Sequence, residues 1–153
     1  MFEYMILPFR RYADFRGRSR RLEFWAFALF NVIVYAVLTA LILGTTGSWQ
    51  SFRDVGTDSY SAAMTVLFGG MGILFLIYWL ATIIPTIAVT VRRLHDRDMS
   101  GWWYLGFVVL SMIPLVGFLV SIAFLVIMLL PGTRGPNRFG PDPKDPSSAE
   151  VFA

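Results

Sequence analysis

Arginine is the most distinctive chemical feature of this chain, because it supplies twelve of the thirteen basic residues. Guanidinium groups bind phosphates and carboxylates through two parallel hydrogen bonds. Seven arginines in three separated polar segments are the candidate residues for binding an anion, a lipid or a partner: Arg18, Arg20, Arg21, Arg92, Arg93, Arg97 and Arg138. Because Glu23, Asp96 and Asp142 lie among them, an internal network of ion pairs is the alternative interpretation.

Catalytic and metal chemistry has little support in the sequence. The chain contains no cysteine and one histidine, His95. Thiol chemistry and sites with two or more Cys or His ligands are therefore excluded, and we expect neither a metal nor a cofactor. The His95-Asp96 pair is expected to cap and orient a turn instead. We propose no catalytic residue and predict that the protein is not an enzyme.

The composition assigns the chain to a membrane. Hydrophobic residues make up 56% and charged residues 15% of the sequence, whereas about 25% of an ordinary soluble domain is charged. The net charge of +3 is small, but the basic residues gather in a few segments. Since those segments adjoin apolar runs, nucleic acid is not an expected partner.

Three uncharged apolar runs must position the polar segments, because about 20 apolar residues cross a bilayer as a helix. The first span covers residues 24–44, and the second covers about 65–90 within an apolar run at 62–91. Pro85 predicts a kink in the second span. Residues 91–103 then form a charged turn at the membrane edge. This turn lies between the two longest apolar runs, and the rest of the chain is organised around it.

One helical face of the first span is polar. Glu23, Phe27, Asn31 and Tyr35 recur every four residues, and residues at this spacing share one face of a helix. Because polar groups are costly in lipid, this face should pack against protein. Glu23 is then expected to pair with Arg92 or Arg93, through the two-point contact that a guanidinium offers a carboxylate.

The third apolar run, residues 102–130, is too long for a straight crossing. As one helix its 29 residues would extend about 43 Å, against a hydrocarbon core of about 30 Å. It is either one tilted and kinked span or a hairpin that turns at Pro114 to Gly117, with arms at 102–113 and 116–130. The tail carries Arg134, Arg138 and Lys144, whereas the expected outside loop at 45–61 carries only Arg53, and this bias favours the hairpin.

The predicted fold is therefore an all-α integral membrane protein, a small helical bundle of three to four membrane segments. Residues 1–23 form a basic and aromatic segment at the cytoplasmic interface, 24–130 the membrane domain, and 131–153 a Gly/Pro-rich cytoplasmic tail. The N-terminus and the C-terminus are both expected in the cytoplasm. Trp25, Trp102 and Trp103 are expected at headgroup level, where tryptophan is enriched.

Three motifs coincide in order along the chain. They are Tyr12-Ala13-Asp14-Phe15-Arg16-Gly17-Arg18-Ser19-Arg20-Arg21-Leu22-Glu23-Phe24-Trp25, then Arg92-Arg93-Leu94-His95-Asp96 with Ser100-Gly101-Trp102-Trp103, and Asn137-Arg138-Phe139-Gly140-Pro141-Asp142-Pro143 after Pro131-Gly132. Together they resemble domain-of-unknown-function family 805, a family of small bacterial inner-membrane proteins. The resemblance implies a multi-pass protein of the bacterial cytoplasmic membrane and carries no activity. The motif residues expected to have structural roles are Gly17, Glu23, Trp25, His95, Asp96, Gly101, Trp102, Trp103, Asn137 and Asp142.

With the predicted topology, all three motifs meet on the cytoplasmic face. The favoured function is that of a non-enzymatic membrane protein whose Arg/Trp-rich face docks anionic lipid or a protein partner, either another membrane protein or a second copy. The alternative is a component of a small transporter or channel. The absence of ionisable residues from 24–44, 62–91 and 102–130 disfavours it, because ion pathways usually contain some.

Overall fold

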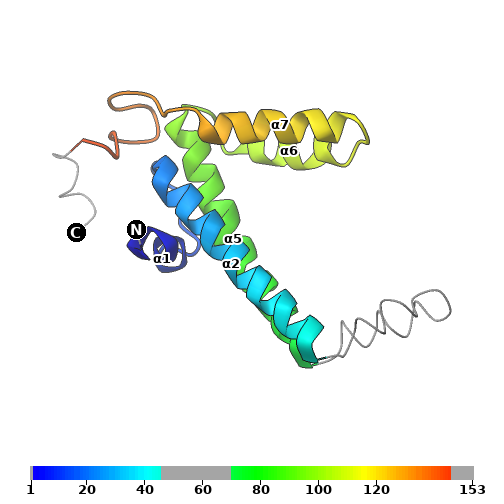
Figure 1. Ribbon diagram of the computed structural model, residues 1–153. Coiled ribbons are helices and arrows are strands. Elements are labelled where there is room, and N and C mark those ends of the chain that lie inside the picture. The colour runs from blue at the N-terminus through cyan, green and yellow to red at the C-terminus, as the bar shows by residue number, and fades with distance from the viewer. Residues whose placement is uncertain (1, 46–69, 146–153) are drawn as a thin grey trace. The chain divides into compact units, whose positions relative to one another are not determined.

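The computed structural model describes residues 2–45 and 70–145, which are helical apart from turns, loops and one isolated bridge between Asn137 and Gly140. Figure 1 shows the helices in chain order. They are α1 (Phe2–Arg10), α2 (Arg21–Thr45), α5 (Gly70–Asp96), α6 (Trp102–Ser111) and α7 (Val116–Leu129). The chain divides into two compact units, residues 1–27 with 84–153 and residues 28–83.

Two helices are long and apolar enough to cross a membrane, Arg21–Ile42 within α2 and Gly72–Asp96 within α5. The described residues form helices and no strand, so the predicted all-helical class is confirmed for them. The expected outside loop at 45–61 and the start of the second apolar run lie outside the described residues, apart from Thr45. Pro85 lies within α5 and is fully buried.

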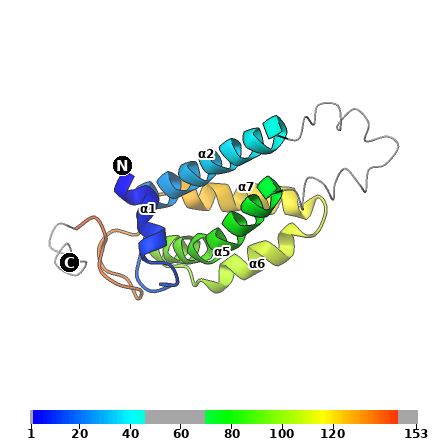
Figure 2. The same ribbon diagram turned by 90° about the horizontal axis from the view of Figure 1, so that it is seen from below.

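In the unit of residues 28–83, α2 and α5 run side by side in each view (Figures 1 and 2). The Tyr78 hydroxyl donates to Asn31 Oδ1 at 2.9 Å, and the hydroxyls of Tyr35 and Thr82 lie 3.0 Å apart. The Tyr35 ring also packs against Phe75 and Tyr78, with centroids 5.3 and 5.2 Å away. The polar face of the first span therefore packs against protein, as predicted.

The helix α5 extends further than the sequence predicted. Residues 91–96, assigned to the charged turn, form the last turns of α5. The helix ends where Asp98 takes a positive φ of 58°, with the amides of Asp98 and Met99 donating to His95 O and Leu94 O at 3.0 Å. This is a Schellman end, with Asp in the position that Gly usually occupies. The charged residues can stay helical because protein groups neutralise them.

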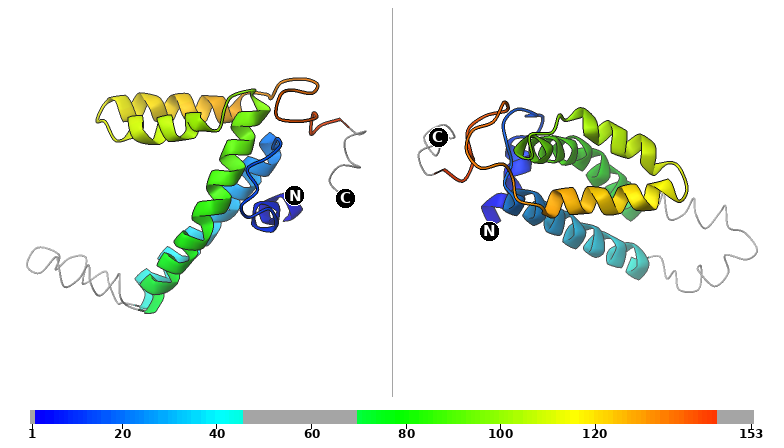
Figure 3. Two further views of the ribbon diagram at one scale, coloured as in Figure 1. Left: turned by 180° about the vertical axis from the view of Figure 1, so that it is seen from behind. Right: turned by 90° about the horizontal axis from the view of Figure 1, so that it is seen from above.

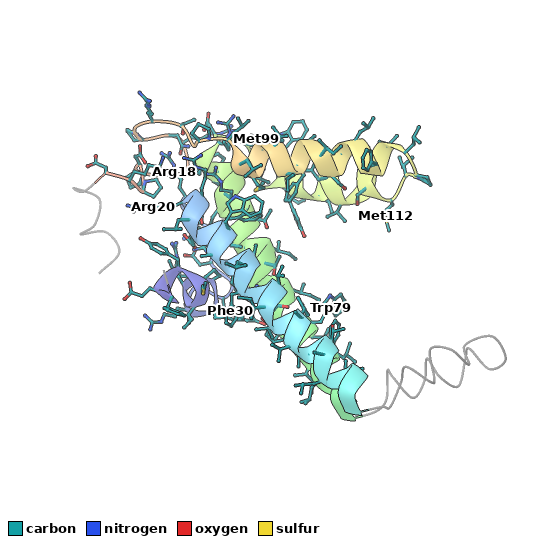
Figure 4. All side chains as sticks on the ribbon, in the orientation of Figure 1. Arg18, Arg20, Phe30, Trp79, Met99 and Met112 are labelled. Carbon is teal, nitrogen blue, oxygen red and sulfur yellow. The ribbon has the colours of Figure 1, made fainter. Side chains whose placement is uncertain are left out.

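The third apolar run forms a helical hairpin, α6 and α7, joined by residues 112–115. Figure 1 shows the two helices side by side, and Met112 lies at the tip of the hairpin in Figure 4. The turn depends on Gly117, because a Cβ there would lie 2.4 Å from the Ser111 carbonyl oxygen. The two helices have 10 and 14 residues and are about 15 and 21 Å long.

The N-terminal segment contains a helix that the sequence did not reveal. In α1, Phe2 and Ile6 are exposed, whereas Pro8 is buried and the Phe9 ring meets Phe27 edge-on at 5.3 Å. Residues 11–20 then approach the end of α5, where the tail also lies (Figure 3). The unit of residues 1–27 and 84–153 thus gathers the three polar segments.

Candidate functional site

Asp96, the last residue of α5, is the carboxylate that two arginines of the seven-residue cluster share. Its Oδ1 accepts from Arg18 Nε at 3.0 Å and lies 2.9 Å from Arg18 Nη2, while Arg93 Nη1 donates to Oδ2. The three side chains are buried, with 4% of Asp96, 3% of Arg18 and none of Arg93 exposed. Two buried cations thus share one buried anion, which is the compensation that buried charges require.

The same residues hold the tail against α5. Arg18 also donates to the carbonyl oxygens of Thr133 and Gly135 at 2.5 and 2.6 Å, and Thr133 N donates to Asp96 O at 2.8 Å. The backbone passes so close to the Asp96 carboxylate that a Cβ on Gly132 would lie 1.9 Å from Oδ2. A glycine is therefore required at this position.

His95 and Asn137 connect the second and third motifs. Asn137 Nδ2 donates to His95 O at 2.8 Å, and the His95 ring stacks on Phe139 with centroids 3.9 Å apart. His95 Nδ1 lies 3.2 Å from the carbonyl oxygen of Gly17, whose φ of +76° favours glycine. The histidine thus contacts both the N-terminal segment and the tail.

Three arginines bind carbonyl oxygens at the C-terminal end of α7 and just beyond it. Arg93 donates to the carbonyl oxygens of Met128 and Leu130, Arg21 Nη1 donates to Leu129 O at 3.2 Å, and Arg97 Nη1 donates to Pro131 O. The last carbonyls of a helix have no partner within the helix and carry partial negative charge. Cations from α2 and from the end of α5 therefore fasten the hairpin.

The predicted pairing of Glu23 is confirmed with Arg92 as its partner. Glu23 Oε1 lies 3.2 Å from Arg92 Nη2, and the two side chains are 6% and 0% exposed. The predicted two-point contact is wrong, because neither Nη atom of Arg92 makes a hydrogen bond within the described residues. The guanidinium is turned, with its Nε 3.4 Å from Ala88 O. The backbone of Arg92 accepts from Ser19 N at 3.1 Å.

The remaining members of the cluster lie nearer the surface. Arg20 donates to the Pro143 carbonyl oxygen. Arg138 donates to Asp98 O at 2.7 Å and pairs with the Asp98 carboxylate at 3.2 Å, where both side chains are exposed. Asp142 accepts from the amides of Lys144 and Gly135 at 3.0 and 3.1 Å. These hydrogen bonds hold the pKa of Asp142 below its usual value, and the one from the Lys144 amide has the largest effect.

Each of the seven arginines thus contacts an acceptor group of the protein, and the seven differ in how deeply they are buried. Arg18, Arg92 and Arg93 are buried and serve the internal network, whereas Arg21 and Arg138 are exposed. Arg20 and Arg97 are half-buried, so the cluster offers a ligand only part of its charge. No group of three His, Asp or Glu side chains that could hold a metal occurs in residues 2–45 and 70–145.

The aromatic and glycine motif residues lie beside the cluster. Trp102 and Trp103 are 79% and 54% exposed, while Trp25 is half-buried. A Cβ on Gly101 would lie 2.7 Å from Val91 Cγ1, so this glycine lets the start of α6 approach α5. Sequence reasoning missed the residues that contribute only carbonyl oxygens, such as Thr133 and Pro143, because every residue type carries that oxygen.

The chain is similar to known proteins over most of its length. Residues 12–141 match the family described as protein of unknown function, DUF805. The chain is 42% identical over 137 residues to inner membrane protein YhaH of Escherichia coli strain K12, covering 88% of this chain and 91% of that protein. It is 38% identical to inner membrane protein YhaI of the same strain, over 88% and 90% of the two chains.

A more distant relative is the uncharacterized protein YiiR of the same strain, 29% identical over 86% of this chain and 87% of that protein. No solved structure matches the chain. The match over residues 12–141 contains the first two motifs and the third as far as Pro141, and YhaH and YhaI are named for the inner membrane. The chain therefore belongs to the DUF805 family and is a protein of the bacterial inner membrane.

Proposed function

We propose that this protein is a non-enzymatic membrane protein whose Arg/Trp-rich face binds the headgroup of an anionic lipid. The observation that carries the proposal is the charge at the end of α7. Among the described residues, Arg21 and Arg97 donate to backbone carbonyls and form no ion pair with a carboxylate. Carbonyls bear no net charge, so positive charge accumulates there and favours an anion.

Two further features support a lipid as the source of that anion. Arg97 is half-buried, and the contact of its Nη1 with Pro131 O is exposed, so a phosphate oxygen can reach this guanidinium. The exposed Trp102 and Trp103 begin α6 next to this charge. Tryptophan prefers the headgroup level of a bilayer, where lipid phosphates are found.

The arrangement also supports a topology. At about 15 and 21 Å, α6 and α7 are shorter than the hydrocarbon core of about 30 Å. In the proposed topology α2 and α5 cross the membrane, and the α6–α7 hairpin enters and returns on the cytoplasmic side. Both termini are then cytoplasmic, which places the basic N-terminal segment and the tail on the side that the positive-inside rule requires.

The topology is tested by labelling single cysteines in intact cells, since the chain has none of its own. A membrane-impermeant maleimide should label Asp58→Cys and should label Lys144→Cys only after the cells are opened. Labelling of Lys144→Cys in intact cells would refute the cytoplasmic tail.

Headgroup binding is tested by native mass spectrometry of the purified protein with phosphatidylglycerol and phosphatidylcholine. A basic residue near an anionic membrane surface contributes about 1 kcal/mol. The double variant Arg21→Gln/Arg97→Gln should therefore retain phosphatidylglycerol about 30-fold less well. The control Arg10→Gln/Arg16→Gln removes the same charge from two exposed positions in the N-terminal segment and should change retention much less. Equal losses in both variants would contradict a specific site.

A further inference from the structure

A groove of about 210 Å³ lies between α6 and α7. On α6 its wall includes Phe107, Val108 and Ser111, and on α7 it includes Ser121 and Phe124. The rings of Phe107 and Phe124 meet edge-on with centroids 5.4 Å apart. The lining residues recur at helical spacing, so each helix contributes one continuous face.

The chemistry of the walls selects an apolar ligand. The Ser111 hydroxyl donates to Val108 O at 2.7 Å, and the Ser121 hydroxyl donates to Gly117 O at 2.8 Å. Both hydroxyl hydrogens are thus used within their own helices, as serine commonly does in apolar helices. The groove offers a ligand aromatic and aliphatic surface.

The dimensions select a thin occupant. The wall on α6 extends from Tyr104 to Ser111, about 10 Å at 1.5 Å per residue. Over that length the volume corresponds to a narrow space of about 20 Å² in cross-section. A single hydrocarbon chain is the thin apolar occupant that such a space favours.

The position of the groove relates it to the proposed headgroup site. It begins two residues after Trp102, at the end of the hairpin where Arg97 contacts Pro131 and Arg21 contacts Leu129. We propose that one acyl chain of the bound anionic phospholipid lies in the groove between α6 and α7. This inference rests on the proposed function, because the arginines place the headgroup from which that chain descends.

The test compares two neighbouring valines on α6 in the full-length protein. Val108 lines the groove, whereas Val109 lies outside it and is 55% exposed. Val108→Trp should fill the groove and lower the retention of phosphatidylglycerol at least tenfold, which corresponds to about 1.4 kcal/mol. Val109→Trp adds the same indole to the outer surface and should leave retention within about twofold of wild type.

A second measurement needs no substitution. Phosphatidylglycerol with a diazirine in one acyl chain is photolysed on the wild-type protein in nanodiscs, and the labelled residues are mapped by mass spectrometry. Labels on Phe107, Ser111 and Phe124 are expected. Their absence, with labels confined to other surfaces, would mean that protein covers the groove and would overturn the inference.

The two proposals fail in different ways. If the wild type prefers phosphatidylglycerol over phosphatidylcholine but both tryptophan variants retain it equally, the acyl-chain site is wrong and the headgroup site stands. If the wild type shows no preference between the two lipids while the acyl-chain photolabel still maps to the groove, the headgroup site is wrong and the groove holds a lipid chain whatever its headgroup.

Discussion

The substitution Asp96→Asn tests whether one carboxylate stabilises the junction of the three polar segments. It preserves the shape of the side chain and removes its charge, leaving Arg18 and Arg93 buried without an anion. Asparagine also presents an N–H group where one of the two guanidiniums needs an acceptor. Removing one member of a buried ion pair costs about 3 to 5 kcal/mol, so we expect a loss of stability of this size.

The control is Asp98→Asn, the same change two residues along the chain. Asp98 pairs with Arg138 at 3.2 Å, but their side chains are 48% and 60% exposed, and exposed pairs contribute about 0 to 1 kcal/mol. Asparagine also tolerates the positive φ of 58° at this position. The control should therefore unfold nearly as wild type does.

The assay is reversible unfolding in detergent micelles, followed by circular dichroism. For a chain of this size a loss of 3 to 5 kcal/mol lowers Tm by about 6 to 20 °C. A double-mutant cycle with Arg18→Gln should show that the combined loss is smaller than the sum of the single losses, because the two residues share one interaction. Strict additivity, or an Asp96→Asn protein as stable as Asp98→Asn, would refute the assignment of Asp96 as the carboxylate that the two arginines share.

Two further substitutions test individual contacts by the same unfolding assay. Glu23→Gln should lower the free energy of unfolding by about 3 kcal/mol, the low end of the range for a buried pair, because no Arg92 N–H is aligned with the carboxylate. A loss below about 1 kcal/mol would mean that the pair behaves as an exposed one. Gly132→Ala should cost about 1 to 3 kcal/mol or more by crowding Asp96. The control is Gly106→Ala, because a Cβ at that position meets nothing within 4 Å. This control should be neutral or should stabilise the protein by up to about 1 kcal/mol. Equal losses of stability at the two glycines would contradict the proposed crowding.

Several features of this protein follow from the sequence because their causes are local. The lengths of the apolar runs predict a membrane protein. The recurrence of Glu23, Phe27, Asn31 and Tyr35 at every fourth residue predicts a face that packs against protein. The order of the motifs indicated the family. The combination of Pro114 and Gly117 marked the site of the turn between α6 and α7, although the charge bias was needed to favour a hairpin over a kinked helix.

Other features depend on contacts between distant parts of the chain, and no local pattern contains them. The sequence contains seven arginines in its polar segments but does not indicate that Arg18 and Arg93 share Asp96. It also does not indicate that Arg21 binds the last carbonyl of α7 and Arg97 the carbonyl of Pro131. Most of their acceptors are backbone carbonyls, which every residue carries, so residue identity cannot reveal the partner. The extension of α5 to Asp96 has the same origin, because the charges of its last turns are tolerated only where Arg18, Glu23 and the end of α7 provide partners for them.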